Sequence, residues 1–361
     1  MGSFQALHDS QWAHTIPSAR ELPSQFVPDA SAPETMRFTN QELHKLFGNR
    51  RLLDWKALES VSTGVQVTDL VDIPLSVGNF TNIKRSKRGK RSKVPRPGHT
   101  LCMDIGFGDG ISPGGHRYCL VVVDAGSRAC WCYGLRDLSG STVADALLQL
   151  LVDVGHDHSH KVVHRILCDF DAKLIRGQAR HLLHRQHIRI LSSVPFRQSQ
   201  NGLAESHWAT AVRMARSYLQ EANLPKRFWF WALRTAFERM NLIPMEIGKG
   251  DDGTPKLSTP FELFFQRKPD LRTLFPFGSV GYFRRETDSA GSQQVHRTKF
   301  QAQTYPGIAL GRSTDTNGLI FWSPETMRFS VSADYTSWTQ TAKSEPTGQS
   351  CSTTVVSPCT I

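Results

Sequence analysis

Between Thr100 and Glu221 the chain alternates short apolar runs with amphipathic segments, and this order restricts the possible fold more than any other feature. The first three runs are rich in Leu, Val, Cys and aromatic residues. Turns containing Gly, Pro and Ser separate them, which is typical of an antiparallel meander. The sequence therefore predicts strands at 100–107, 117–124 and 129–135.

Helical and extended patterns then alternate. Apolar residues recur from Val143 to Val154 at the spacing of an amphipathic helix, and Ser139 or Ser141 is a suitable N-cap. This order is that of an α/β domain, and a mixed five-stranded sheet flanked by helices accommodates it. The remaining elements that we expect are a strand at 162–169, a helix at 175–187, a strand at 188–192 and a long helix at 201–221.

A further helix is predicted at 225–241, where four aromatic residues at 228–231 lie among basic side chains. Aromatic residues interleaved with bases can stack on nucleotides. Phe228, Trp231 and Ala232 share one helical face, however, so we favour packing in a core. Further along, runs at 278–285, 305–311, 319–322 and 327–331 have hairpin spacing and predict a small β-barrel.

The length of 361 residues allows two or three domains. Stretches rich in Ser, Pro and Gly mark the boundaries, and such stretches without periodicity are typical of disorder. We divide the chain into a flexible leader (1–38), a segment with a short helical patch at 40–58 and a basic linker (39–97), an α/β core (98–245), a linker (246–268), a barrel (269–340) and a disordered tail (341–361).

The positive charge of the chain is concentrated in one place. Lys and Arg number 43 against 32 Asp and Glu, a net charge of +11, and residues 84–96 hold eight bases and no acid. Such a run can contact phosphates or act as a nuclear-import signal, and a solvated linker is an equally open interpretation. The candidate nucleic-acid contacts in it are Lys84, Arg85, Lys87, Arg88, Lys90, Arg91 and Lys93.

The sequence gives no sign of a membrane or secretory route. Its longest apolar runs, such as 119–123, fall far short of the roughly 18 residues that a spanning helix needs. The N-terminus has no apolar core of a signal peptide. The seven cysteines, an odd number in a long chain, favour reduced thiols. We therefore expect a soluble intracellular protein with no membrane partner.

Three acidic positions are candidates for chemistry. Asp104 lies inside the first predicted strand, where a carboxylate is costly unless it is paired, bound to metal or exposed on an edge. Asp169 follows the fourth strand, with Asp171 as its rival, and either can serve in a turn. Glu205 lies in the first turn of the long helix, where the helix dipole alone favours an acid.

If these three carboxylates lie close together in the fold, a metal site becomes the simplest interpretation. Three carboxylates from two strands and a helix repel one another, and one or two divalent cations would offset that repulsion. Ligation by oxygen alone selects Mg²⁺ or Mn²⁺. Asp104, Glu205 and one of the two aspartates after the fourth strand are therefore candidate metal ligands.

Spacing and local motifs lead to a family resemblance. Between Asp169 and Glu205 lie 35 residues, whereas Asp171 would leave 33. With this spacing the chain resembles the integrases of retroviruses and LTR retrotransposons, whose core has an RNase H-like fold and a D, D, 35, E signature. The stretches LCMDIG at 101–106 and PFRQSQNGLAE at 195–205 look like the copia-type motifs. Residues 259–283 and 307–326 resemble the copia-type connection to an SH3-like barrel and that barrel.

The resemblance implies an integrase that trims the 3′ ends of an element's cDNA and transfers them into target DNA. Asp104, Asp169 and Glu205 would be its catalytic residues and would hold two Mg²⁺ or Mn²⁺ ions about 3.5–4 Å apart. It also implies DNA as the partner, both element ends and target, a homo-oligomer in the active assembly, and work in the nucleus.

Two departures from the family concern the N-terminal module and the long helix. His44 looks like part of an N-terminal zinc module, but Asn49 stands where a second histidine belongs. Because no cysteine precedes Cys102, no structural zinc is expected, and we interpret 39–97 as a degenerate remnant of that module with the basic linker. The long helix lacks the usual early bases, and we expect Arg213 and Arg216 to contact DNA instead.

Two other functions stay open. An inactive relic of an integrase would keep the fold and bind nucleic acid without chemistry. An RNase H-type nuclease would cut RNA–DNA hybrids without joining strands, although its usual set of four carboxylates is not evident in this sequence. Metal-dependent nicking or strand joining on a labelled DNA end separates an active enzyme from the relic.

Overall fold

The computed structural model describes residues 35–48, 55–68, 95–157, 159–168, 177–192, 202–249, 253–284, 304–313, 316 and 318–337. Two of the candidate acids, Asp169 and Asp171, lie outside these ranges. The basic residues from Lys84 to Lys93 lie outside them as well.

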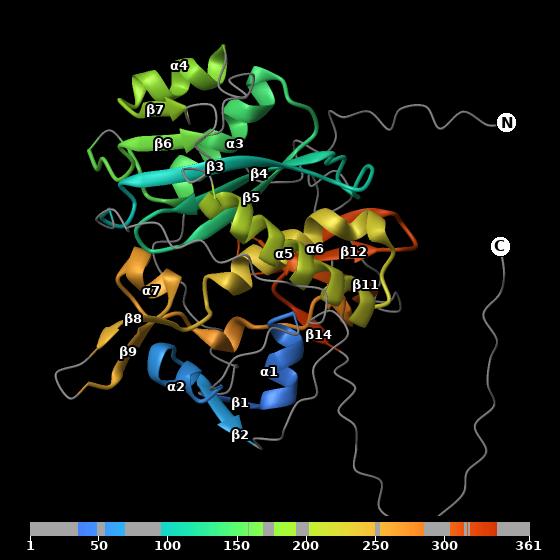
Figure 1. The fold of residues 1–361 in the computed structure, drawn as a ribbon. Coiled ribbons are helices and arrows are strands. Elements are labelled where there is room, and N and C mark those ends of the chain that lie inside the picture. Colours follow the sequence, from blue (N-terminus) through green and yellow to red (C-terminus); the bar gives the residue numbers. More distant parts are fainter. Residues whose placement is uncertain are drawn as a thin grey trace, which may run out of the picture.

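The centre of the structure is a five-stranded mixed sheet in the order β5-β4-β3-β6-β7 (Figure 1). The pairs β5/β4 and β4/β3 are antiparallel, whereas β3/β6 and β6/β7 are parallel. This arrangement confirms the predicted α/β fold class. Its strands are β3 (Thr100–Phe107), β4 (Tyr118–Asp124), β5 (Cys130–Leu135), β6 (Arg165–Cys168) and β7 (Arg189–Ser192).

Helices cover both faces of this sheet (Figure 1). On one face lie α3 (Gly140–Asp153) and α4 (Gln178–Arg185), and on the other lie α5 (Gly202–Glu221) and α6 (Trp229–Met240). Ser139 caps α3 as predicted, since its side chain accepts a hydrogen bond from the Thr142 amide. Within the described ranges, no helix has both the length and the apolar composition needed to cross a membrane.

The aromatic residues before and within α6 are core residues, as predicted. Phe228 ends the short 3₁₀ helix η3 (Lys226–Phe228), and its ring meets that of Trp322 edge to face at 6.0 Å between centroids. The ring centroids of Trp231 and Phe329 are 4.8 Å apart. All four aromatic side chains at 228–231 are buried. Helix α6 therefore packs between the central sheet and a second sheet.

That second sheet is antiparallel, with the order β13-β12-β11-β10-β14, and it is consistent with the predicted SH3-like barrel. Strand β14 was not expected, because its three residues are too few to show an alternating pattern. The strands are β10 (Val280–Arg284), β11 (Thr304–Arg312), β12 (Leu319–Ser323), β13 (Arg328–Ser332) and β14 (Tyr335–Ser337).

The segment predicted as a linker at 246–268 contains regular structure. Strands β8 (Met245–Lys249) and β9 (Pro255–Ser258) form a hairpin, and α7 (Pro260–Phe265) follows it. Thr259 caps α7 by accepting from the Glu262 amide, and Pro260 occupies its first turn. This regular structure was not expected, because the hairpin is largely exposed and contains several glycines, so the sequence shows no apolar face there.

A small N-terminal unit precedes the core. It consists of β1 (Met36–Thr39), α1 (Asn40–Leu46), α2 (Ala57–Val61) and β2 (Val65–Thr68), with the two strands parallel. Strand β1 starts inside the predicted leader, and the single helical patch predicted at 40–58 is divided between two helices. A capping box joins Thr39 and Glu42 at the start of α1. The unit shares its apolar core with Ile243, Leu271 and Leu274 from far downstream.

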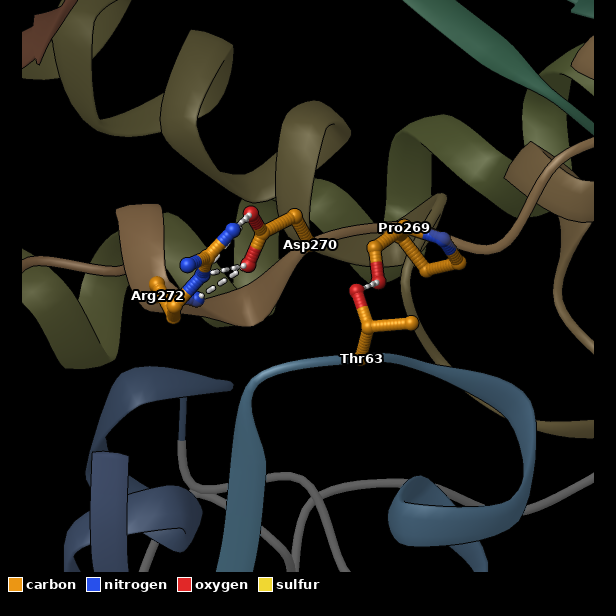
Figure 2. Close-up of polar contacts among 4 residues, drawn as sticks. All are labelled: Thr63, Pro269, Asp270 and Arg272. Atoms are coloured by element: carbon orange, nitrogen blue, oxygen red, sulfur yellow. Dashed lines mark hydrogen bonds and ion pairs between the residues drawn. The ribbon is translucent and has the colours of Figure 1, made fainter. Parts of the chain in front are cut away.

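Main-chain and side-chain contacts fix this unit against residues 269–272 (Figure 2). The Thr63 amide donates to the Pro269 carbonyl at 2.9 Å, and the Leu271 amide donates to the Thr63 carbonyl at 3.0 Å. Beside them Arg272 forms an ion pair with Asp270, with 2.6 Å between Nη2 and Oδ2. The unit is thus attached to the connection between the central sheet and the second sheet.

Candidate active site

Asp104 lies in the middle of β3 on the sheet face that α5 covers. Side chains alternate along a strand, so Asp104 shares its face with Cys102 and Gly106. The ring of Trp208 from α5 lies directly over Gly106, and a β-carbon there would collide with it. The Asp104 side chain is partly buried, and its Oδ1 accepts a hydrogen bond from the Ile105 amide at 2.8 Å.

The neighbouring strand leads to the second predicted carboxylate. In the parallel pair of β3 and β6, Met103 is the partner of Cys168. Asp104 is the next residue after Met103, and Asp169 is the next residue after Cys168. The described part of β6 therefore ends beside Met103, one residue before Asp169.

Glu205 lies in the first turn of α5, and its side chain is exposed. Its neighbour Ala204 is fully buried and belongs to the same apolar cluster as Cys102 of β3. The start of α5 is thus anchored over the sheet face that carries Asp104. In the part of the chain that the structure describes, no group of three His, Cys, Asp or Glu side chains could hold a metal ion, and that part includes only two of the three predicted ligands.

Comparisons with known proteins find relatives among retrotransposon Pol polyproteins. No protein-family model matches the chain. It is 24% identical over 229 residues to the retrovirus-related Pol polyprotein from transposon TNT 1-94 of Nicotiana tabacum, a match covering 62% of this chain and 16% of that protein. The retrovirus-related Pol polyprotein from transposon RE2 of Arabidopsis thaliana is 24% identical, over 52% of this chain and 12% of its own length. The chain is a relative of retrotransposon Pol polyproteins.

Retroviral integrases are among the solved structures to which this chain is similar. The catalytic core domain of BIV integrase is 16% identical, with a TM-score of 0.34 over 47% of this chain and 95% of that one. The HTLV-2 integrase catalytic core domain in complex with magnesium is 18% identical, with a TM-score of 0.34 over 47% of this chain and 97% of that one. The chain spans only 12–16% of the length of the two curated relatives named above. The predicted relationship to retrotransposons agrees with these curated relatives, and the fold assignment rests on the strand order.

Two of the predicted DNA contacts, Arg213 and Arg216, are described, and both lie on α5. The Arg213 and Arg216 side chains are exposed, and Nη2 of Arg213 donates to Oγ1 of Thr210 at 3.1 Å. Arg216 follows Glu205 by 11 residues, close to three helical turns, so the two side chains share one face of the helix. The predicted contacts at Lys84, Arg85, Lys87, Arg88, Lys90, Arg91 and Lys93 lie outside the described residues.

His44, the residue that resembles part of a zinc module, lies within the N-terminal unit as a buried aromatic side chain. Its ring meets that of Trp55 edge to face at 6.1 Å between centroids. The surrounding core is apolar and includes Leu43, Phe47 and Leu58. Packing against these side chains stabilises the region around His44.

A turn beside the site contains Arg128, a residue that the sequence did not single out. Asp124, predicted to serve in a turn, is buried and accepts from the Gly98 amide at 3.0 Å and from the Ser127 amide at 2.6 Å. The turn places Arg128 in the left-handed region, with φ of 70°. Arg128 lines a cavity of about 230 Å³ together with Ser206 and Thr210 of α5. A positive φ at a residue other than glycine leaves no signal in one sequence.

Proposed function

We propose that the chain is the integrase segment of a retrotransposon and catalyses 3′-end processing and strand transfer of element cDNA into target DNA. The observation that carries the proposal is the register in which Met103 is paired with Cys168. With that register, the residues that follow them, Asp104 and Asp169, would meet under the start of α5. Glu205 would then complete a set of three carboxylates.

Asp104, Asp169 and Glu205 would hold two Mg²⁺ or Mn²⁺ ions. The donor set fits these cations, because three carboxylates offer only oxygen ligands. Asp104 also fits in position, since it is a partly buried acid on a sheet face that is otherwise apolar. When bound, such a pair of cations activates a water or a 3′-hydroxyl and stabilises the leaving oxygen.

The side chains of this chain would supply positioning. Asp104 is fixed in a central strand, where its Oδ1 is held by the Ile105 amide. Glu205 is exposed at the start of a helix, so a DNA strand can approach it. Arg213 and Arg216, together with the basic segment at 84–96, would bind phosphates without regard to sequence, and this binding would weaken steeply with salt. A homo-oligomer acting in the nucleus belongs to the same proposal.

A strand-joining assay on a labelled DNA end tests this function. With Mn²⁺ or Mg²⁺, the wild-type chain should trim the end and join it to target DNA, and Glu205→Gln should do neither. Glu221→Gln is the matched control, because it makes the same change in an exposed side chain at the far end of α5. It should keep the wild-type rate.

Each contrary outcome has a defined meaning. DNA binding by the wild-type chain without any product would favour the inactive relic. Cleavage of an RNA–DNA hybrid without joining would favour the RNase H-type nuclease. Equal joining by wild type and Glu205→Gln would remove Glu205 from the catalytic set.

A further inference from the structure

A cleft lies beside the start of α5, separate from the three carboxylates. One wall is polar and consists of Arg128 from the turn before β5 and of Ser206, His207 and Thr210 from α5. The other wall is apolar and is lined by residues from Met240 at the end of α6 to Pro260 at the start of α7. The cavity measures about 230 Å³. Ser206 directly follows Glu205, so a ligand in the cleft lies next to the proposed active site.

Asn241 joins three of the elements that form this cleft. Its Oδ1 accepts from the Cys130 amide and its Nδ2 donates to the Cys130 carbonyl, both at 2.8 Å. Its own carbonyl accepts from the Phe261 amide at 2.9 Å. Arg128, Met240 and Pro260 each lie within two residues of one of these groups. The walls are therefore held in place before any ligand arrives.

The hydroxyl groups of the polar wall offer lone pairs to a ligand. Ser206 donates its own hydrogen to the Leu203 carbonyl, and Thr210 donates to the Ser206 carbonyl, both at 2.9 Å. A hydroxyl that has donated its hydrogen can still accept through two lone pairs, and Thr210 uses one of them for Nη2 of Arg213. The wall thus combines a guanidinium, which attracts an anion, with acceptors that suit the N–H groups of a ligand.

We propose that this cleft binds one unpaired nucleotide of a DNA end. Its phosphate would pair with Arg128, its base would lie against the apolar wall near Met240 and Ile243, and an exocyclic amino group would donate to Ser206 or Thr210. Adenine and cytosine carry such an amino group, whereas thymine does not. This inference rests on the proposed function, because it takes DNA as the substrate.

Binding assays in EDTA test the site apart from any chemistry. Three labelled duplexes are compared by fluorescence anisotropy: one blunt, one with two unpaired adenines at an end, and one with two unpaired thymines. The wild-type chain should bind the adenine end about fivefold more tightly than the blunt duplex, which is the contribution of one typical net hydrogen bond. The thymine end should fall between them.

Two variants remove the two kinds of contact. Arg128→Asn deletes the charge with a residue that tolerates a positive φ, and it should reduce the slope of log affinity against log salt for the unpaired ends by about 0.7. The double variant S206A/T210V should remove the difference between adenine and thymine ends. Arg185→Gln is the matched control, an exposed arginine of α4 on the other face of the sheet, and it should behave as wild type.

A fluorescent base gives a second readout. With 2-aminopurine as the unpaired base, its emission should change on binding to wild type and to Arg185→Gln, and the change should be lost in Arg128→Asn. Circular dichroism checks that each variant is folded. Wild-type binding that is equal for blunt and unpaired ends, or a preference that survives both variants, overturns the site alone. Failure of the wild-type chain to bind any of the duplexes overturns the proposed function as well.

Discussion

The indole of Trp208 lies over Gly106 and leaves no room for a side chain at that position. This contact joins the helix that carries Glu205 to the strand that carries Asp104. Trp208 follows Glu205 by three residues and Gly106 follows Asp104 by two. The distance between Asp104 and Glu205 therefore depends on the absence of a β-carbon at position 106 of β3.

Gly106→Ala should reduce strand joining by about 100-fold, because displacement of a catalytic group by about 1 Å costs that much. The added methyl group would push Trp208, and α5 with it, away from β3. Trp208→Leu in the same chain should restore part of the rate by making space. Gly248→Ala, where nothing lies within 4 Å, is the control and should be as active as wild type. An unaffected rate in Gly106→Ala would contradict the proposed coupling of helix and strand.

Metal binding should depend on Asp104 even without DNA. At about 100 times its Kd, Mn²⁺ should raise the Tm of the wild-type chain by roughly 5 °C. Asp104→Asn should lose most of this shift, whereas Asp109→Asn, an exposed acid on the following turn, should keep it. Differential scanning calorimetry measures both. An equal shift in the Asp104 variant would show that the ion binds elsewhere.

Gly64→Ala should destabilise the N-terminal unit. Gly64 has a φ of +72°, and a β-carbon there would collide with the Arg272 side chain that pairs with Asp270. Left-handed backbone costs an alanine about 1–2 kcal/mol, and the collision adds about 1–3 kcal/mol. Gly155→Ala, with φ of +67° and open space around it, should show the first cost only. Urea unfolding followed by tryptophan fluorescence gives both values, and equal losses would contradict the packing argument.

His116 should make the chain less stable in mild acid. Burial, followed by the nearby Arg136 and Arg234, lowers the pKa of His116 from 6.5 to about 4. As the pH falls below about 6.5, the unfolded state binds a proton that the folded state does not. The free energy of unfolding should therefore fall between pH 6.5 and pH 4, by about 3 kcal/mol in all, and this contribution should be constant above pH 6.5.

The variant His116→Gln should lack this part of the pH dependence, because glutamine does not titrate. Urea unfolding at pH 7 and pH 5 measures it in both chains. A loss of stability on acidification that is the same in the variant would assign the effect to other groups.

The central sheet could be predicted from sequence because its elements carry their own patterns. Strand β3 occupies the predicted residues Thr100–Phe107, and α3 follows the spacing of Val143, Leu147 and Leu150. The sequence predicted one buried apolar face for helix α6. Trp229 and Phe230, outside that face, are buried as well, because a second sheet covers the other side. That second partner lies far along the chain, so local periodicity does not reveal it.

The parts that escaped prediction depend on distant or exposed contacts. Strand β1 pairs with β2, some 30 residues away, and the contact of Thr63 with Pro269 spans about 200 residues. For the candidate site, the sequence singled out Asp104 by its position inside a strand and Glu205 by its spacing from Asp169. It did not single out Arg128, whose place in the cleft depends on the turn around Asp124. The assignment of Asp169 stays a prediction.

The shared core of the N-terminal unit has a consequence for the order of events on the ribosome. Phe38, Leu43 and Val65 are buried against Ile243, Leu271 and Leu274, which are synthesised about 200 residues later. The N-terminal unit must therefore wait with these apolar side chains uncovered until residues 243–274 are made. Shortened versions that stop before Leu271 would leave that surface permanently exposed, and expression should succeed best when the chain extends through Leu274.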